Sequence, residues 1–205
     1  MLAFPATSHR LLFDDDIDMH LKHQTQTGFT LIELMVTIAI AAILLSMAIP
    51  SFTNAIAGNR LTTAANELVT ALNLARSEAV KRGHPVVVRK TGAQWENGWR
   101  VFVDIDRATA ASQNDFGGTD IELRIFPALP GGYTLRGNNN FTNFIRYEPD
   151  GLSNNIGSFL LCNNGNIVGA RLMIVNAVGR LRMGSDADNN GIPEGDNNAE
   201  ITSCI

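Results

Sequence analysis

Residues 29–50 read FTLIELMVTIAIAAILLSMAIP, and this stretch decides the fold. Glu33 is its only charged residue, and residues 34–49 are mostly Leu, Ile, Ala, Met and Val. About 20 apolar residues in helical form cross the hydrocarbon core of a bilayer, so the stretch is long enough to span a membrane. Lys22 precedes it and no basic residue follows it before Arg60, a distribution that favours a cytoplasmic N-terminus.

Two features distinguish this stretch from an ordinary secretory signal. Such a signal has an apolar core of roughly 7–15 residues followed by a small-residue cleavage site. Here the apolar run is longer, and no A-x-A-like site follows it. In addition, Glu33 places a carboxylate near the start of the membrane segment, where an unpaired charge is costly. Glu33 is therefore a candidate functional residue that needs a partner.

The string GFTLIEL at residues 28–34 resembles the N-terminal signal of type IV pilins and type II secretion pseudopilins. By this resemblance, a prepilin peptidase cuts after Gly28 and methylates the new amine of Phe29. Glu33 becomes the fifth residue of the mature chain and neutralises the α-amino group of a neighbouring subunit. The resemblance also implies two further kinds of partner, namely other pilins or pseudopilins and an inner-membrane assembly platform. We expect a single-pass protein of the bacterial inner membrane whose C-terminal domain lies in the periplasm or in an extracellular filament.

Residues 1–28 form the leader in this interpretation, and they are unusual for the family. Residues 14–18 read DDDID, an acidic run ahead of a membrane segment. Met19 offers an internal start that would leave a ten-residue leader, MHLKHQTQTG, with Lys22 as its positive charge. Two alternatives stay open: residues 1–18 are a wrongly assigned start, or the leader is long and disordered.

Residues 51–83 continue the apolar run as an amphipathic helix. Apolar residues recur at alternating spacings of four and three, which is the period of one helix face: Leu61, Ala65, Leu68, Leu72, Ala75 and Ala79. Gly83 and Pro85 supply the stop, whereas Pro50 is expected to kink the helix without ending it. We predict one helix over residues 29–82, about 80 Å long, with a transmembrane part at 29–50 and its Leu/Ala stripe packed on the domain that follows.

Residues 84–205 change to short β-rich runs separated by Gly, Asn and Pro turns. The predicted strands are residues 85–90, 99–104, 121–126, 133–136, 144–147, 158–162, 171–176 and 179–183. A long helix followed by strands is an α+β arrangement, here a helix packed on an antiparallel β-sheet domain. The resemblance implies that this is the type IV pilin-like fold.

Further residues resemble one branch of this superfamily, the GspH/FimT branch of minor pilins and H-type pseudopilins. They are ARSEA at 75–79, Gly151, FLLC at 159–162, Arg171 and GRLR at 179–182. The branch implies a subunit that is assembled into, or primes, either a type IV pilus or a type II secretion pseudopilus. The chain itself does not separate these two machines.

Cys162 and Cys204 are the two cysteines. In the cytosol they would be free thiols, whereas export favours one disulfide. Because the resemblance implies export, we expect the bond, which would tie down the Gly/Asn-rich tail and constrain the unfolded chain by about 4 kcal/mol.

The sequence offers little for catalysis. Three of its four histidines lie in the leader, and the fourth, His84, follows the predicted helix. No Cys/His pair has zinc spacing, and neither a phosphate-binding glycine loop nor a G-x-S-x-G motif occurs. We expect no enzymatic activity and no organic cofactor. Net charge is −4, and residues 29–205 carry 14 basic and 16 acidic side chains, which argues against binding nucleic acid by bulk charge.

Arg180 and Arg182 suggest an alternative function, because residues two apart on a strand share a face and two guanidiniums suit phosphate. The G-R-x-R string resembles the motif through which FimT-type minor pilins bind DNA during uptake. The other interpretation is a solvated strand face or ion pairs to Asp186 and Asp188. Trp95 and Trp99 could stack on bases if exposed, but we expect them to anchor the turn at Asn97-Gly98.

Asp186, Asp188 and Asn190, followed by Gly191, fit the opening of a calcium loop, D-x-D-x-N-G. The position that holds a bidentate glutamate in an EF-hand is Asn197 here. Calcium binding and a polar Asx-turn loop are therefore alternatives for this segment.

Overall fold

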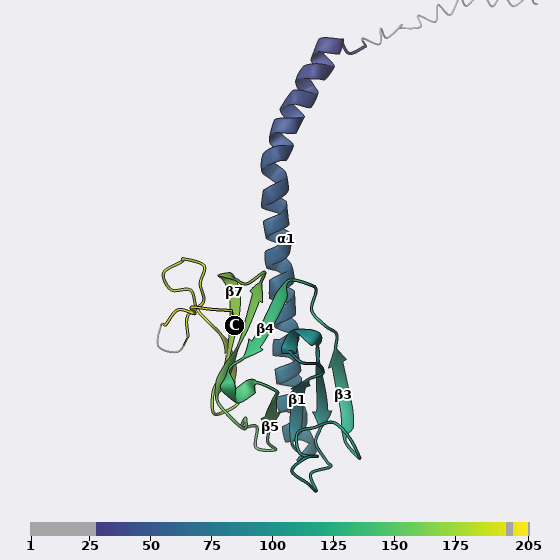
Figure 1. The fold of residues 1–205 in the computed structure, drawn as a ribbon, viewed down its shortest axis with the longest axis vertical. Helices are drawn as coiled ribbons and strands as arrows, with labels where there is room; N and C mark the ends of the chain where they lie inside the picture. The colour runs from purple at the N-terminus through teal and green to yellow at the C-terminus, as the bar shows by residue number, and fades with distance from the viewer. Residues whose placement is uncertain (1–27, 196–198, 205) are drawn as a thin grey trace, which may run out of the picture. The chain divides into compact units, whose positions relative to one another are not determined.

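The computed structural model describes residues 28–195 and 199–204. The leader before Gly28, the alternative start at Met19 and Asn197 lie outside these residues. The elements are α1 (Leu31–Arg82), β1 (Val86–Lys90), η1 (Trp95–Asn97), β2 (Trp99–Val103), β3 (Ile121–Phe126), β4 (Tyr133–Gly137), η2 (Asn139–Phe141), β5 (Phe144–Tyr147), β6 (Gly157–Asn163), β7 (Asn166–Val175) and β8 (Leu181–Met183) (Figure 1).

Helix α1 ends where predicted, at Arg82, and begins at Leu31, two residues after the predicted start. Thr30 caps it, since its Oγ1 accepts the Glu33 N–H at 3.2 Å and its carbonyl accepts the Leu34 N–H at 3.1 Å. Gly83 ends it in the left-handed conformation, with φ of 66° and a hydrogen bond from its N–H to the Ala79 carbonyl at 3.0 Å. The helix continues through Pro50, as predicted. The chain divides between Ser46 and Met47 into two compact units.

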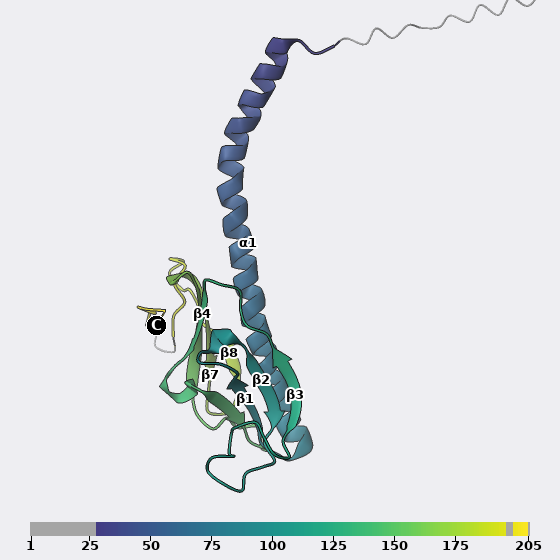
Figure 2. The ribbon, with the colours of Figure 1, turned by 45° about the vertical axis from the view of Figure 1, so that its right-hand side comes forward.

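In the second unit, the Leu/Ala stripe of α1 packs on the strands (Figures 1 and 2). All six predicted stripe residues are buried, and they join one core cluster with the inward residues of both sheets. Val86 and Val88 of β1 and Phe159 and Leu161 of β6 are examples of these inward residues. The stripe therefore belongs to the core, which is the interpretation that its spacing favours.

The strands form two antiparallel sheets, with the orders β3-β2-β1-β5 and β4-β6-β7-β8. All eight predicted strands are present. The largest difference concerns β7, which begins at Asn166, five residues before the predicted start at Arg171. Asn164 and Gly165 have φ of 50° and 70°, so they make a tight two-residue hairpin and the strand pairs at once, with Asn163 opposite Asn166.

The two tryptophans are buried, which confirms that they anchor the turn. Trp95 and Trp99 are 1% and 0% exposed. The Trp95 Nε1–H donates to the Phe141 carbonyl at 2.8 Å, and its ring meets Phe159 edge-to-face with centroids 5.0 Å apart. Trp99 stacks on Phe126 at 5.4 Å. Neither ring is available to stack on a base.

Cys162 and Cys204 form the predicted disulfide, with their Cα atoms 6.1 Å apart. Both are buried, beside Ala170. The bond holds the end of the described chain against β6. Between β8 and Cys204, isolated bridges join Ser185 to Glu194 and Glu194 to Glu200.

Candidate functional site

The predicted processing site lies where the extended chain enters α1. Gly28 and Phe29 precede the helix, no atom lies near the place where a Gly28 Cβ would stand, and Phe29 is 80% exposed. Glu33 lies in the first helical turn and is exposed. Its backbone N–H is capped by Thr30, but within the described residues its carboxylate has no hydrogen-bond or ion-pair partner. A helix N-terminus favours a carboxylate there, and leaves it available to a cation from another molecule.

The helix surface that follows Glu33 is apolar and uncovered. Every large apolar side chain from Phe29 to Phe52 is at least half exposed. The most apolar 18-residue window of α1 has a mean hydropathy of 2.5, and no residue in it is buried. Length and composition make α1 the one helix of the described chain that could cross a membrane. A continuous apolar surface of this size needs lipid or protein to cover it.

Three of the residues that suggest the GspH/FimT branch, Arg76, Gly151 and Gly179, lie together. The Arg76 Nε–H donates to the Gly151 carbonyl at 2.9 Å, and its Nη2 donates to the Val178 carbonyl at 3.2 Å. Gly179 has φ of 71°, and a Cβ there would lie 2.4 Å from the Gly151 oxygen. Burial raises the pKa of the nearby Tyr147 hydroxyl, an effect that the Arg76 charge opposes. Arg76 therefore attaches two distant turns to α1, a role that the sequence did not reveal.

The structure places Arg180 outside the strand predicted for it. Strand β8 begins at Leu181, and Arg180 ends the preceding turn, where its N–H donates to Asn176 Oδ1 at 2.9 Å. Arg182 pairs with Ile174, which lies outside the core cluster, so Arg182 is on the outward face of its sheet. Both arginines are exposed. The two guanidiniums thus come from a turn and a strand, because the Asn176 side chain closes the turn before the ladder begins. DNA binding through them stays a prediction.

The predicted calcium ligands accept hydrogen bonds from their own loop. Asp186 Oδ2 accepts the Gly191 N–H at 2.9 Å, and Asp188 Oδ1 accepts the Asn190 N–H at 3.2 Å. Asn190 Oδ1 accepts the Ile192 N–H at 2.8 Å. The contacts of Asp188 and Asn190 are Asx turns, the alternative considered for this segment. Within residues 28–195 and 199–204, no group of three His, Cys, Asp or Glu side chains is arranged to hold a metal. Calcium binding stays a prediction.

Two family models match the chain. The model described as type II transport protein GspH matches residues 64–179, more than half of the chain. The model described as the prokaryotic N-terminal methylation motif matches residues 23–49. The first therefore covers the stripe of α1 from Ala65 onward and strands β1 to β7. The second covers the predicted cleavage site and the apolar part of α1.

Two curated proteins of Pseudomonas aeruginosa, both named fimbrial protein, are 41% identical to this chain over 68 residues. The match covers 33% of this chain and 44% of each relative, so the chain spans less than half the length of the curated relatives it matches. The similarity is limited to that segment and says nothing of the activity of those proteins as wholes.

Crystal structures of the type IV minor pilin FimU of Pseudomonas aeruginosa share the fold. In one crystal form the TM-score is 0.53 at 20% identity, with 72% of this chain and 96% of that chain covered. In a second form the TM-score is 0.50 at 19% identity, with 70% and 99% covered. The fold is thus that of a type IV minor pilin, an α+β arrangement, as predicted.

Proposed function

Because the chain belongs to the GspH family of type II transport proteins and carries the N-terminal methylation motif, we propose that it is a filament subunit. In this role it is a minor pilin or pseudopilin made as a precursor and anchored by α1. It serves a structural function without enzymatic activity. It is then assembled into, or primes, a type IV pilus or a type II secretion pseudopilus.

One observation carries this proposal, the uncovered apolar surface of α1 with a single carboxylate in its first turn. In a bilayer, lipid covers that surface and the helix satisfies its own backbone hydrogen bonds. When the subunit leaves the membrane, only the equivalent helices of other subunits offer a matching apolar cover. The apolar residues of α1 are therefore suited both to a bilayer and to a packed helical bundle.

Glu33 has a defined role when α1 moves from lipid into a bundle of protein helices. A carboxylate among apolar helices is costly unless a cation pairs with it. Cleavage after Gly28 creates a cation, the α-amino group of Phe29, four residues before Glu33. In a staggered bundle the amine of one subunit reaches Glu33 of its neighbour. The exposed carboxylate and the uncrowded Gly28 support this proposal.

The proposed partners and location follow from the same features. A prepilin peptidase would cut at Gly28 on the cytoplasmic side, and an inner-membrane platform would extract the subunit. Residues 51–205 would then lie in the periplasm or in the filament. The disulfide between Cys162 and Cys204 supports this location, since such bonds persist in the oxidising periplasm and on cell surfaces.

The experiment is an incorporation assay in the native cell, comparing Glu33→Gln with wild type. We expect the variant to be cleaved normally but lost from the sheared or pelleted filament fraction, because it cannot pair with the neighbouring amine. Glu67→Gln is the matched control, since Glu67 is a partly buried carboxylate on the same helix beyond the apolar stretch. Normal incorporation of Glu33→Gln would contradict the assembly role.

A further inference from the structure

The outward face of sheet β3-β2-β1-β5 carries a pocket that the filament role does not use. It encloses about 310 Å³, and its lining includes Arg89 and Lys90 of β1, Arg100 and Phe102 of β2, and Asp115 and Phe116 of the β2–β3 connection. Phe102 is fully buried but does not belong to the core cluster that contains α1. The β2–β3 connection therefore covers this side of the sheet, and the pocket lies beneath the cover.

Two arginines face each other in this pocket. Arg89 and Arg100 are directly opposed residues of the antiparallel pair β1 and β2. Their side chains are 30% and 29% exposed, so water screens them incompletely. Like charges at directly opposed positions destabilise a pair of strands. The arrangement therefore requires a compensating anion.

Each arginine has one carboxylate beside it, so the surplus positive charge of the pocket comes from Lys90. Asp115 Oδ1 lies 3.3 Å from Arg89 Nε, and the Asp115 side chain is 57% exposed at the pocket mouth. Glu122 Oε2 lies 2.8 Å from Arg100 Nε, but that nitrogen is buried without a hydrogen bond. Within the described residues the Arg100 guanidinium donates no hydrogen bond at all. The buried Nε faces Glu122, so the donors left for a ligand are those of Nη1 and Nη2.

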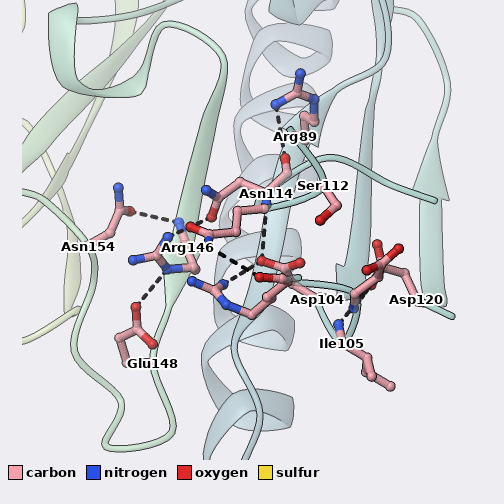
Figure 3. Close-up of polar contacts among 12 residues, drawn as sticks. Arg89, Asp104, Ile105, Ser112, Asn114, Asp120, Arg146, Glu148 and Asn154 are labelled. Carbon is pink, nitrogen blue, oxygen red and sulfur yellow. Dashed lines mark hydrogen bonds and ion pairs between the residues drawn. The ribbon is translucent and has the colours of Figure 1, made fainter. Parts of the chain in front are cut away.

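The cover over the pocket is fixed in place by Asn114 (Figure 3). The Asn114 carbonyl accepts from Arg89 Nη1 at 2.9 Å, and its Oδ1 accepts from Arg146 Nη1 at 2.7 Å. Its N–H donates to Asp104 Oδ2 at 3.1 Å. The residues Asp115 and Phe116 that follow are thereby held over the sheet.

Phe116 in turn orients Arg100. The Arg100 Cζ lies 4.2 Å from the centroid of the Phe116 ring, and that ring meets Phe102 edge-to-face at 5.4 Å. Stacking on one face holds a guanidinium in a fixed plane while its N–H edge stays free. The pocket thus presents pre-oriented donors and excess positive charge.

We propose that this pocket binds a phosphate group, as inorganic phosphate or as the terminal phosphate of a small phosphomonoester. A tetrahedral dianion offers several acceptor oxygens to two guanidiniums that approach from neighbouring strands. Asp115 and Glu122 each contact one of the two guanidiniums, whereas a phosphate can bridge both. Asp115 at the mouth competes with the ligand for Arg89. The proposal does not depend on filament assembly.

The test is calorimetric titration of the full mature chain in non-ionic detergent with inorganic phosphate at constant ionic strength. We expect saturable binding at one site, weakened about tenfold or more in Arg100→Gln, since a charge-assisted hydrogen bond is lost. Arg124→Gln is the matched control, because Arg124 stacks on Phe126 at 4.6 Å in the same sheet but outside this pocket. Absence of saturable binding, or equal weakening by both variants, would overturn the proposal.

A second variant tests the proposal even if Arg100→Gln folds poorly. Asp115→Asn removes an exposed competing charge, so we expect phosphate to bind more tightly, and unchanged or weaker binding would overturn the proposal. A further titration uses short-chain phosphatidic acid below its micelle concentration. Binding of this lipid with the same dependence on Arg100 would identify a phosphomonoester site, whereas binding of phosphate alone would identify a site for the free ion.

Discussion

At the scale of single residues, Arg76 joins parts of the chain that are far apart in sequence. It lies on α1 and donates to the carbonyls of Gly151 and Val178, which are 75 and 102 residues away. An aliphatic side chain would leave both carbonyls without this donor, and a lysine would lose the planar fork that reaches two acceptors at once. The contact therefore depends on the guanidinium and not only on its charge.

We expect Arg76→Lys to lower the free energy of unfolding by about 2 kcal/mol, because two charge-assisted hydrogen bonds lose their geometry. Chemical denaturation of the mature chain measures the change. Ser77→Ala is the control, since Ser77 is exposed and its hydroxyl bonds only the Leu74 carbonyl of its own helix. Equal stability of Arg76→Lys and wild type would show that these hydrogen bonds contribute little.

Asp104 makes stability depend on pH. Its side chain is fully buried, and its Oδ1 has no hydrogen-bond partner within the described residues. Burial raises the pKa of the Asp104 carboxyl above its usual 3.8, although the Asn114 N–H and the Arg107 charge oppose the shift. The folded chain therefore holds this proton to higher pH than the unfolded chain does. Its contribution to stability falls as pH rises from below 3.8 through the folded-state pKa.

We expect Asp104→Asn to remove this loss of unfolding free energy with rising pH. An amide does not ionise, and its oxygen can still accept hydrogen bonds from Arg107 and Asn114. Unfolding free energies of wild type and variant, measured between acid and neutral pH, give the comparison. The same slope in both proteins would mean that Asp104 is not the group responsible.

At the scale of the elements, the sequence correctly predicted the helix and strand limits that depend on neighbouring residues in the chain. The spacing of Leu61 through Ala79, and the Gly83 and Pro85 stop, define the end of α1 within the chain itself. The start of β7 was missed because Gly169 and Ala170 weaken the β signal, while the hairpin at Asn164-Gly165 sets the pairing. Arg180 was assigned to a strand because its sequence cannot show that Asn176 closes the turn before it.

The candidate sites follow the same rule: the sequence predicts a site only where its residues lie close together in the chain. Gly28, Phe29 and Glu33 lie within six residues of sequence, so a short motif predicts them together. The phosphate pocket was not predicted, although basic residues occur at Arg89 and Arg100 in two predicted strands. Its cover depends on Asn114, whose contacts with Arg89 and Arg146 join residues 25 and 32 positions apart. Contacts of this range follow from the tertiary structure and leave no local pattern.

The disulfide joins β6 to the end of the described chain across a separation of 42 residues. We expect reduction to lower the free energy of unfolding by about 4 kcal/mol, because the unfolded chain regains the conformations that the closed loop excludes. Thermal melts with and without reductant measure the effect. In the control, Cys162→Ser/Cys204→Ser, reductant should change nothing, and a wild-type melt that is insensitive to reductant would contradict the prediction.

At the scale of the whole molecule, the GspH-family fold and the uncovered helix support one order of processing and assembly steps. In the proposed function, the precursor would enter the inner membrane through α1, lose its leader, form its disulfide and join a filament through the same helix. Two of these steps, leader removal and disulfide formation, change the covalent structure of the chain. The central claim, that the protein is a processed filament subunit, can therefore be tested without knowing which machine it serves.

The most direct measurement is the intact mass of the protein extracted from native membranes. We predict a chain that begins at Phe29, is heavier by one methyl group, and is lighter by the two hydrogens lost when Cys162 and Cys204 are joined. A mass that retains residues 1–28 would contradict the account, because an uncleaved chain has no Phe29 amine to pair with Glu33.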